Sequence, residues 1–381
     1  MRIGHLSVLA LALFALLAGC GKKEAAVSGP ETIRIGSVAT LTGAQSHFGK
    51  DNDNGARLAI DEINAQGLIL GGKPVKLELI SEDDAADPKT ATHVAQKLAD
   101  LGVKAVIGHL NSGTSIPASK IYHDAGIPQI SPSATATAYT AQGYDTTYRV
   151  IANDTQQGKV LGRYAVDKMA ARKIAIVDDR TAYGQGLADE FERAATAAGA
   201  TVVAREYTSD KATDFTAILT SIKGKSVDLV FFGGMDSQGG PLTRQMERLG
   251  LTAKLLGGDG VQNANFLRLA GADAEGVVAT SPGLPLVAMP GGNAFKQRFE
   301  ARFGEIQAYA PYAYDAVQVL VAAMRRADSA EPAKILAALP KTDHQGVTGP
   351  LRFDAKGDTT GGAVTVYRVE NGAWAVLETV K

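Results

Sequence analysis

The chain has 381 residues, of which 45% are hydrophobic and 21% are charged, and its formal net charge is −1. At ~150 residues per domain this length predicts about two to three domains, the balanced charge argues against a nucleic-acid-binding protein, and the hydrophobic content argues against disorder. A single cysteine excludes an intramolecular disulfide and a multi-cysteine zinc site.

The first 19 residues have the features of a secretory signal. Arg2 precedes an apolar run from Leu6 to Ala18, which is shorter than the ~20 residues that a membrane-spanning helix needs. The run ends in Leu17-Ala18-Gly19-Cys20, which resembles a bacterial lipobox, in which the chain is cut before the cysteine and the thiol is lipidated. We expect a signal peptide over 1–19, then a lipidated Cys20 and a tether over 20–30. An ordinary signal peptide and a buried free thiol are the alternatives.

Strand and helix patterns alternate from residue 31 onward. The predicted strands are Thr32–Ala39, Pro74–Ser81, Lys104–Gly108 and Ile127–Ser131, and the predicted helices are Asp53–Gln66 and a segment from Asp87-Pro88 to Leu101. Asp87 is suited to cap that second helix, with Pro88 at its first position. This order predicts a mostly parallel sheet with helices on both faces.

The same pattern starts again after residue 154 and predicts a second doubly wound unit. Its helices are Thr155–Met169, Leu187–Ala198, Phe215–Ile222 and Gly240–Leu249, and its strands are Lys173–Val177, Thr201–Tyr207, Asp228–Phe232, Lys254–Leu256 and Val277–Thr280. Three helical stretches follow at 293–303, 312–327 and 332–338, and a hairpin of Ala363–Val369 and Ala373–Thr379 ends the chain. Two such units with additional helices predict two lobes between which the chain crosses more than once.

No complete nucleotide-binding or catalytic motif occurs in the chain. A near match to a phosphate loop runs from Gly43 to Lys50, but its spacing is one residue too long and Asp51 stands where serine or threonine is needed. Asp83-Asp84 could act in acid–base chemistry or bind a cation, and we favour a solvated loop or cap. We expect no metal and no cofactor, and we interpret five histidines without partners at useful spacing as surface or packed residues: His47, His93, His109, His123 and His344.

Small hydroxyl residues follow two neighbouring predicted strands. The segments are 109–115 (HLNSGTS), which leads into a helix near Ile116, and 132–137 (PSATAT). Doubly wound sheets bind ligands beyond the carboxyl ends of their strands, and hydroxyl groups with backbone N–H groups at a helix start suit an anion. We therefore expect an anion site of carboxylate size, with simple capping and turn chemistry as the alternative.

The second unit offers a different chemistry at the corresponding strand ends. Strand 173–177 leads into 178–184 (DDRTAYG), and strand 254–256 leads into 257–260 (GGDG). An anion site on one lobe that faces a carboxylate on the other is suited to a zwitterion. A tyrosine between them could cover an apolar side chain.

Seven segments spread over residues 31–380 carry a resemblance to a known family: Gly55–Gly67 (GARLAIDEINAQG), Asp83–Lys89 (DDAADPK), Val106–Leu110 (VIGHL), Ser131–Thr135 (SPSAT), Tyr183–Ala188 (YGQGLA), Gly258–Val261 (GDGV) and Gly349–Gly357 (GPLRFDAKG). With these segments the chain resembles the leucine/isoleucine/valine-binding proteins, which are type I periplasmic solute-binding proteins of ABC importers. The resemblance is specific to the family and not to one ligand.

The resemblance implies roles for particular residues of the expected site. In that family a serine and a hydroxyl residue hold the amino-acid carboxylate, which implies these roles for Ser112 and Thr135, with Ser133 adding a backbone or hydroxyl contact. A tyrosine that packs on the ligand corresponds to Tyr183. A glutamate that takes the ammonium corresponds to Asp259, which keeps the charge and is one methylene shorter.

Further positions correspond to the mouth and wall of the family's site. Aromatic residues near the mouth correspond to Phe48 and Tyr309. Met235 stands where close relatives often carry tyrosine, so either a polar contact is lost or the methionine forms an adaptable apolar wall. Family members can carry a disulfide at the positions of Ala86 and Asn111, and here both cysteines are absent.

The resemblance also implies a layout of two Rossmann-like α/β lobes joined by a three-stranded hinge. Lobe one is expected to comprise 31–152 plus 283–361, and lobe two 153–282 plus 362–381. Closure of the lobes is expected to enclose the ligand.

The function implied is that of the binding component of an ABC importer for a branched-chain or other aliphatic amino acid. We expect a periplasmic monomer without enzymatic activity that is anchored to the membrane by lipid, works with permease subunits and binds no nucleic acid. The alternatives are another small solute (an amide, urea, a γ-amino acid or an aromatic acid), a ligand-sensing module and an exported α/β hydrolase.

Overall fold

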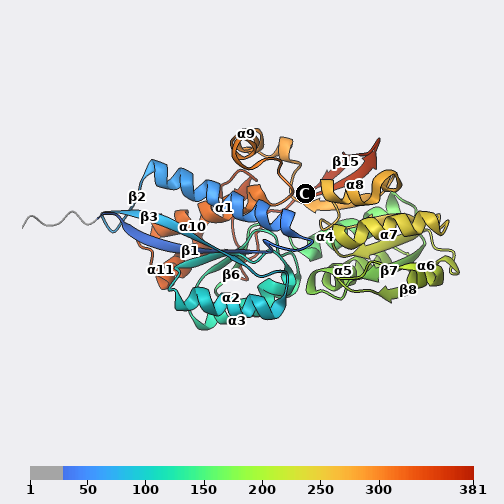
Figure 1. Cartoon of the computed structure of the whole chain (residues 1–381), viewed down its shortest axis with the longest axis horizontal. Helices are drawn as coiled ribbons and strands as arrows, with labels where there is room; N and C mark the ends of the chain where they lie inside the picture. The colour runs from blue at the N-terminus through green and yellow to red at the C-terminus, as the bar shows by residue number, and fades with distance from the viewer. Residues whose placement is uncertain (1–28) are drawn as a thin grey trace, which may run out of the picture.

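The computed structural model describes residues 29–381, so Cys20 and the predicted signal segment lie outside the described residues. Two sheets covered by helices follow one another along the long axis of the molecule (Figure 1). We call the part built on strands β1–β6 lobe one, and the part built on β7–β11, β14 and β15 lobe two. Within residues 29–381, no helix combines the length and the apolar character needed to cross a membrane.

The sheet of lobe one is mostly parallel. Its order is β2 (Leu68–Leu70), β3 (Lys73–Asp83), β1 (Glu31–Ala39), β4 (Ala105–Gly108), β5 (Gln129–Ser131) and β6 (Thr147–Arg149). Only β2 runs antiparallel to its neighbour. Because β1 pairs with β3 on one side and with β4 on the other, the chain changes direction across the sheet between β1 and β4. Such a switch point leaves a crevice at the carboxyl ends of the strands.

Six helices cover lobe one: α1 (Ser46–Gln66), α2 (Pro88–Asp100), α3 (Ser112–Asp124), α9 (Gly292–Phe303), α10 (Ala310–Ala327) and α11 (Pro332–Ala338). As predicted, Asp87 caps α2 by accepting from the Thr90 backbone N–H, and Pro88 is its first residue. In contrast, α1 begins seven residues before the predicted start. The polar Lys50–Asp53 segment masks the helical pattern, since Asp51 is buried and accepts hydrogen bonds from the backbone N–H groups of residues 307–310.

Lobe two repeats the doubly wound plan and adds an antiparallel hairpin. Its sheet order is β15 (Ala373–Val380), β14 (Val364–Glu370), β11 (Val278–Pro282), β10 (Lys254–Gly257), β9 (Leu229–Gly233), β7 (Lys173–Asp178) and β8 (Thr201–Tyr207). The helices are α4 (Asp154–Asp167), α5 (Ala182–Ala197), α6 (Thr216–Lys223), α7 (Asp236–Arg248) and α8 (Ala264–Ala270). The predicted pair of doubly wound sheets is confirmed. The sequence pattern missed β2, β6 and α8. Elements this short carry little periodic signal, although β5 and α11, which are equally short, were predicted.

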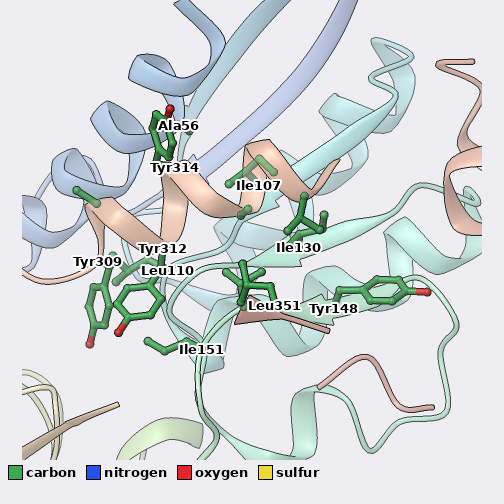
Figure 2. Close-up of a cluster of buried hydrophobic side chains, with 14 of the residues drawn as sticks. Ala56, Ile107, Leu110, Ile130, Tyr148, Ile151, Tyr309, Tyr312, Tyr314 and Leu351 are labelled. Atoms are coloured by element: carbon green, nitrogen blue, oxygen red, sulfur yellow. The ribbon is translucent and has the colours of Figure 1, made fainter. Parts of the chain in front are cut away.

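The chain passes three times between the lobes. It leaves lobe one after β6, returns after β11 and crosses again before β14. A large apolar cluster continues across this junction and includes Leu110 and Ile151 beside the start of α10 (Figure 2). The exact residue limits predicted for the two lobes stay a prediction.

Two polar residues of lobe one are more deeply buried than the sequence indicated. The prediction of a solvated loop at Asp83-Asp84 is wrong for Asp84, which is fully buried. His109 lacks a partner in sequence but not in space, because its Nδ1 lies 2.9 Å from Asp84 Oδ2 and its Nε2 lies 3.1 Å from Tyr122 Oη. These bonds join the two segments that hold Ala86 and Asn111, where the resemblance implies a missing disulfide.

β12 (His344–Gln345) and β13 (Pro350–Leu351) form a separate two-stranded sheet, and the turn between them bonds to Asp315 of α10. Leu351 from this sheet reaches the apolar cluster, and Tyr309 and Tyr312 at the start of α10 point their hydroxyl groups out of it (Figure 2). The Tyr312 hydroxyl donates to the carbonyl of Pro282, 2.7 Å away at the end of β11. The start of α10 is thereby fixed to the junction between the lobes.

Candidate functional site

A small cavity lies between the lobes at the carboxyl ends of the parallel strands. The cavity has a volume of only about 20 Å³ and is lined by Leu110, Asn111, Ser112, Ser133, Tyr183, Met235, Asp259 and Tyr309. Six of these eight residues are among the ligand-binding residues implied by the resemblance. Ligand sites typically measure about 300–1,000 Å³, so the two lobes stand closed here with room for little more than one water molecule between them.

One wall of the cavity is the carboxylate of Asp259, which follows β10. Its Oδ1 accepts from Gln157 Nε2 and from the Tyr183 hydroxyl, each at 2.9 Å, and its Oδ2 accepts from the Tyr309 hydroxyl at 2.6 Å. Burial raises the pKa of Asp259, while these three donors act in the opposite direction. A carboxylate has about four acceptor positions, so one remains for a positively charged ligand group.

The glycines on either side of Asp259 allow this close packing. A Cβ atom on Gly258 would lie 2.3 Å from Leu187 Cδ2 and 2.8 Å from the Tyr183 hydroxyl oxygen, and one on Gly260 would lie 2.5 Å from the Gly234 carbonyl oxygen. The backbone N–H of Gly260 donates to the Tyr183 hydroxyl at 2.9 Å. The Gly-Asp-Gly sequence thus brings the acid within reach of the tyrosine.

Tyr183 and Tyr309 both act as hydrogen-bond donors to Asp259. Burial, together with the charge of Asp259, raises the pKa of both Tyr183 and Tyr309 well above the ordinary value of a phenol. Both phenols therefore keep their protons. Tyr183 lies in the first turn of α5, which begins five residues earlier than predicted, so it is held by a helix and not by a loop.

The opposite wall is the start of α3, which begins at Ser112, four residues before the predicted position. The first N–H groups of a helix have no partner within the helix, and the helix dipole adds a partial positive charge there. The Ser112 hydroxyl oxygen accepts from the Ala136 backbone N–H at 3.1 Å, so its own proton is free to be donated. This wall can hold an anion opposite Asp259.

Ser133 contributes less through its hydroxyl than the sequence suggested. The hydroxyl donates to the Leu110 carbonyl oxygen at 2.9 Å and accepts from Asn52 Nδ2 at 3.0 Å. Its side chain is therefore occupied, and a ligand contact there would come from the backbone.

The apolar part of the cavity comes from both lobes. Leu110 and Tyr309 belong to lobe one, and Met235, immediately before α7, belongs to lobe two. Met235 is buried, with 5% of its surface exposed. Its thioether therefore presents an adaptable apolar surface toward the cavity.

Phe48 and Thr135 lie behind the cavity rather than in its lining. Phe48 is fully buried and packs against Tyr309, with 5.4 Å between the ring centroids. Thr135 is also fully buried, and its hydroxyl has no hydrogen-bond partner within residues 29–381.

Two further residues behind the acidic wall were missed by the sequence analysis. Gln157 Nε2 donates to Asp259 Oδ1 at 2.9 Å and also to Asp154 Oδ1 at 3.4 Å, and its Oε1 accepts from Thr280 at 2.8 Å. Burial, reinforced by the charge of Asp259, raises the pKa of Asp154 to about 8. Both residues lie at the start of α4, where a capping sequence hides any other role.

A larger recess on the surface of lobe two is not the candidate ligand site. It lies between α4, α7 and the starts of β10 and β11, with Lys254 and Val278 in its lining. These are the amino ends of the strands, opposite the crevice that such sheets use for ligands. Across residues 29–381 no group of three or more metal-ligating side chains is arranged to hold a metal ion.

The sequence of the chain matches a known protein family. The model of the family described as periplasmic binding protein matches residues 32–373. The chain belongs to the periplasmic binding protein family. A Leu/Ile/Val-binding protein homolog 1 of Brucella melitensis is 37% identical over 90% of this chain and 91% of its own length. A leucine-, isoleucine-, valine-, threonine- and alanine-binding protein of Pseudomonas aeruginosa is 35% identical over 93% of this chain and 94% of its own length.

Solved structures of periplasmic binding proteins share the fold. A leucine-binding protein of Thermotoga maritima superposes with a TM-score of 0.85 at 26% identity, covering 91% of this chain and 98% of that one. The branched-chain amino acid substrate-binding protein of Streptococcus pneumoniae in complex with isoleucine superposes with a TM-score of 0.83 at 30% identity, covering 92% and 99%. The predicted family and its two-lobed fold are thereby confirmed.

Proposed function

We propose that this chain is the solute-binding component of an ABC importer and binds a branched-chain or other aliphatic amino acid between its lobes. The observation that carries the proposal is the pairing of opposite chemistries across one small cavity. Asp259 on lobe two faces Ser112 and the start of α3 on lobe one. A zwitterionic ligand can place its ammonium group against Asp259 and its carboxylate against Ser112 and the start of α3.

The remaining walls select the side chain of the amino acid. Leu110, Met235 and the ring of Tyr309 present apolar surface to the cavity. An aliphatic side chain gains from leaving water there, at ~25 cal/mol for each Å² of apolar surface buried. The names of the relatives that bind leucine, isoleucine and valine support the same choice.

Each lobe contributes part of the ligand contact. Ser112 and Ser133 come from lobe one, and Tyr183 and Asp259 come from lobe two. A ligand shifts the balance between open and closed lobes only when it binds the closed arrangement better. Contacts on both lobes meet this condition, so binding is coupled to hinge closure.

The proposal extends to location and partners. The protein acts in the periplasm, where it delivers the amino acid to membrane permease subunits, and Cys20 carries the lipid that holds it at the membrane. One acyl chain gives only marginal anchoring, whereas the several chains of a lipoprotein cysteine give a stable anchor. Metabolic labelling with a fatty-acid analogue tests the anchor, with Cys20→Ser as the variant that loses the label.

A thermal-shift screen of residues 21–381 tests the ligand class. Leucine, isoleucine, valine and alanine form one group, and phenylalanine, glutamate, γ-aminobutyrate, urea and acetamide form the other. A ligand at 100 times its Kd stabilises the protein by ~2.7 kcal/mol. The proposal predicts shifts with the aliphatic amino acids, and a shift with γ-aminobutyrate, urea or acetamide alone contradicts it. Unfolding and refolding before the screen removes any amino acid that co-purifies.

A further inference from the structure

His47 and Asp236 meet across the cleft and form an ion pair when His47 is protonated. His47 lies in the first turn of α1 in lobe one, and Asp236 is the first residue of α7 in lobe two. His47 Nε2 lies 2.8 Å from Asp236 Oδ2. The Asp236 side chain is fully buried, whereas 21% of the His47 side chain is exposed. The pair therefore stands where the cleft meets solvent.

The two residues are chain neighbours of two apolar residues at the site. Phe48 follows His47 and supports the ring of Tyr309, while Met235 precedes Asp236 and lines the cavity. The ion pair thus joins the segment that backs the apolar wall in lobe one to the segment that forms it in lobe two. Neither His47 nor Asp236 is part of the cavity lining.

We propose that His47 and Asp236 are positioning residues that hold the lobes closed over the bound amino acid. The contact joins two lobes, so it exists only in the closed arrangement, and a contact made in only one of two states shifts the balance toward that state. For its ligand this inference rests on the proposed function. It adds a residue pair that sets how fast the ligand is released.

The surroundings of Asp236 favour a positive partner. Asp236 Oδ2 accepts from Asn265 Nδ2 at 3.0 Å, while Oδ1 has no hydrogen-bond partner within residues 29–381. The His47 contact is a close approach of charges without the alignment of a hydrogen bond. A buried carboxylate with one oxygen left without a donor favours a nearby positive charge, which His47 supplies when protonated.

Closure through this pair depends on pH. Imidazole groups gain positive charge as the pH falls from 8 to 5, so the closed arrangement gains most from the pair at low pH. Two basic residues also lie near His47: Arg268 of α8 lines the recess beside it, and Lys50 follows on α1. Asp51 on α1 and Tyr309 before α10 also face this region, and both remain in every variant compared.

Release kinetics of L-leucine from the purified full-length protein test the proposal. Stopped-flow fluorescence at pH 5.5 and pH 8.0 gives the association and dissociation rates for wild type, His47→Gln and Asp236→Asn. His123→Gln is the matched control, because His123 also lies near an aspartate, Asp145, but within lobe one alone. His47→Gln is the decisive variant, since His47 is partly exposed and its replacement leaves no cavity in the core.

The expected result is a dissociation rate at pH 5.5 that is roughly tenfold higher in His47→Gln and Asp236→Asn than in wild type, with little change in association rate. The difference shrinks at pH 8.0, and His123→Gln behaves as wild type. Wild-type dissociation in His47→Gln at both pH values overturns the proposal. A purely structural role would change stability without this dependence on pH.

A second readout does not require leucine to be the ligand. Fluorophores on Lys120→Cys in lobe one and Lys225→Cys in lobe two, in the full chain with Cys20→Ser, report the distance between the lobes without ligand. The proposal predicts a larger closed fraction at pH 5.5 than at pH 8.0, and the loss of this response in His47→Gln. An identical response in both proteins overturns it. Failure of leucine to bind, with this response intact, instead counts against the proposed function alone.

Discussion

The hydroxyl group of Tyr309 in lobe one donates a hydrogen bond to Asp259 in lobe two, with 2.6 Å between Tyr309 Oη and Asp259 Oδ2. The residue proposed to hold the ligand ammonium is therefore itself held by the opposite lobe. The bond occupies one acceptor position of a buried carboxylate, beside the two donors Gln157 and Tyr183 that come from lobe two itself. Closure of the lobes thus adds the third donor to the acidic wall.

Tyr309→Phe tests this bond. The change removes the hydroxyl and keeps the ring that packs on Phe48. A hydrogen bond to a charged group contributes ~1.5–3 kcal/mol, so the affinity for leucine is expected to fall by roughly 10- to 150-fold. Isothermal titration measures it, with Tyr314→Phe as the control, since the Tyr314 hydroxyl bonds Glu62 away from the cavity. Unchanged affinity in Tyr309→Phe would show that the bond does not contribute.

Asp259→Ala is expected to abolish measurable leucine binding without unfolding the protein. Truncation of one partner of a buried charge pair costs ~2–5 kcal/mol, which is roughly 30- to 4,000-fold in affinity. Titration with leucine and a circular dichroism spectrum check the two parts of this prediction. Asp167→Ala, at an exposed position of the same lobe, is the matched control. Wild-type affinity in Asp259→Ala would refute the assignment of the ammonium site.

Asp154 makes the stability of the protein depend on pH. Its pKa is raised to about 8 from an ordinary value of 3.8, so the folded protein keeps a proton that the unfolded chain releases. The stability that this proton contributes is complete below pH ~4 and is lost as the pH rises through 8. Asp154→Asn is expected to lose less stability than wild type between pH 6 and pH 9. Melting temperatures across this range measure it, and parallel curves for the two proteins would contradict it.

The buried Asp84–His109 contact is expected to stabilise lobe one. His109→Ala leaves the Asp84 carboxylate buried without its partner, which costs about 3 kcal/mol, whereas His93→Ala at an exposed position is expected to have little effect. Urea unfolding compares the two. A loss below about 1 kcal/mol in His109→Ala would show that the contact contributes little to folding.

The same contact predicts a response to acid. Burial alone would raise the pKa of Asp84, but the hydrogen bond and charge of His109 outweigh it, so the pKa is lowered. The stability that Asp84 contributes is therefore present above the ordinary carboxyl range and is lost as the pH falls through the lowered pKa. His109→Ala is expected to begin acid unfolding at a higher pH than wild type. Coincident acid transitions would contradict this prediction.

Much of the fold was predictable because its signals are local. The strands 173–178 and 201–207 and the cap at Asp87 follow from residue types within a few positions of one another. The start of α1 was not predictable, because the helix continues through polar residues that are satisfied by the distant loop at 307–310. The segments that bear Ser112, Tyr183 and Asp259 could be placed at strand ends from sequence.

The bonds between these segments could not be predicted. Gln157 and Asp154 lie at the capped start of α4, and Gln157 reaches Asp259 only because α4 packs beside β10. Tyr309 was expected as an aromatic ring at the mouth, and nothing in its neighbours indicates a hydroxyl bonded to an acid 50 positions away. Side-chain partners that are distant in the chain depend on the packing of whole elements.

A set of matched ligands shows whether the cavity recognises both charges of an amino acid. Isothermal titration compares leucine with 4-methylpentanoate, which lacks the ammonium, and with 3-methylbutylamine, which lacks the carboxylate. We expect leucine to bind and each analogue to bind at least about 30-fold more weakly, since either loss leaves a buried charged or polar wall unpaired. Binding of 4-methylpentanoate as tight as that of leucine would contradict the role of Asp259 and the proposal that rests on it.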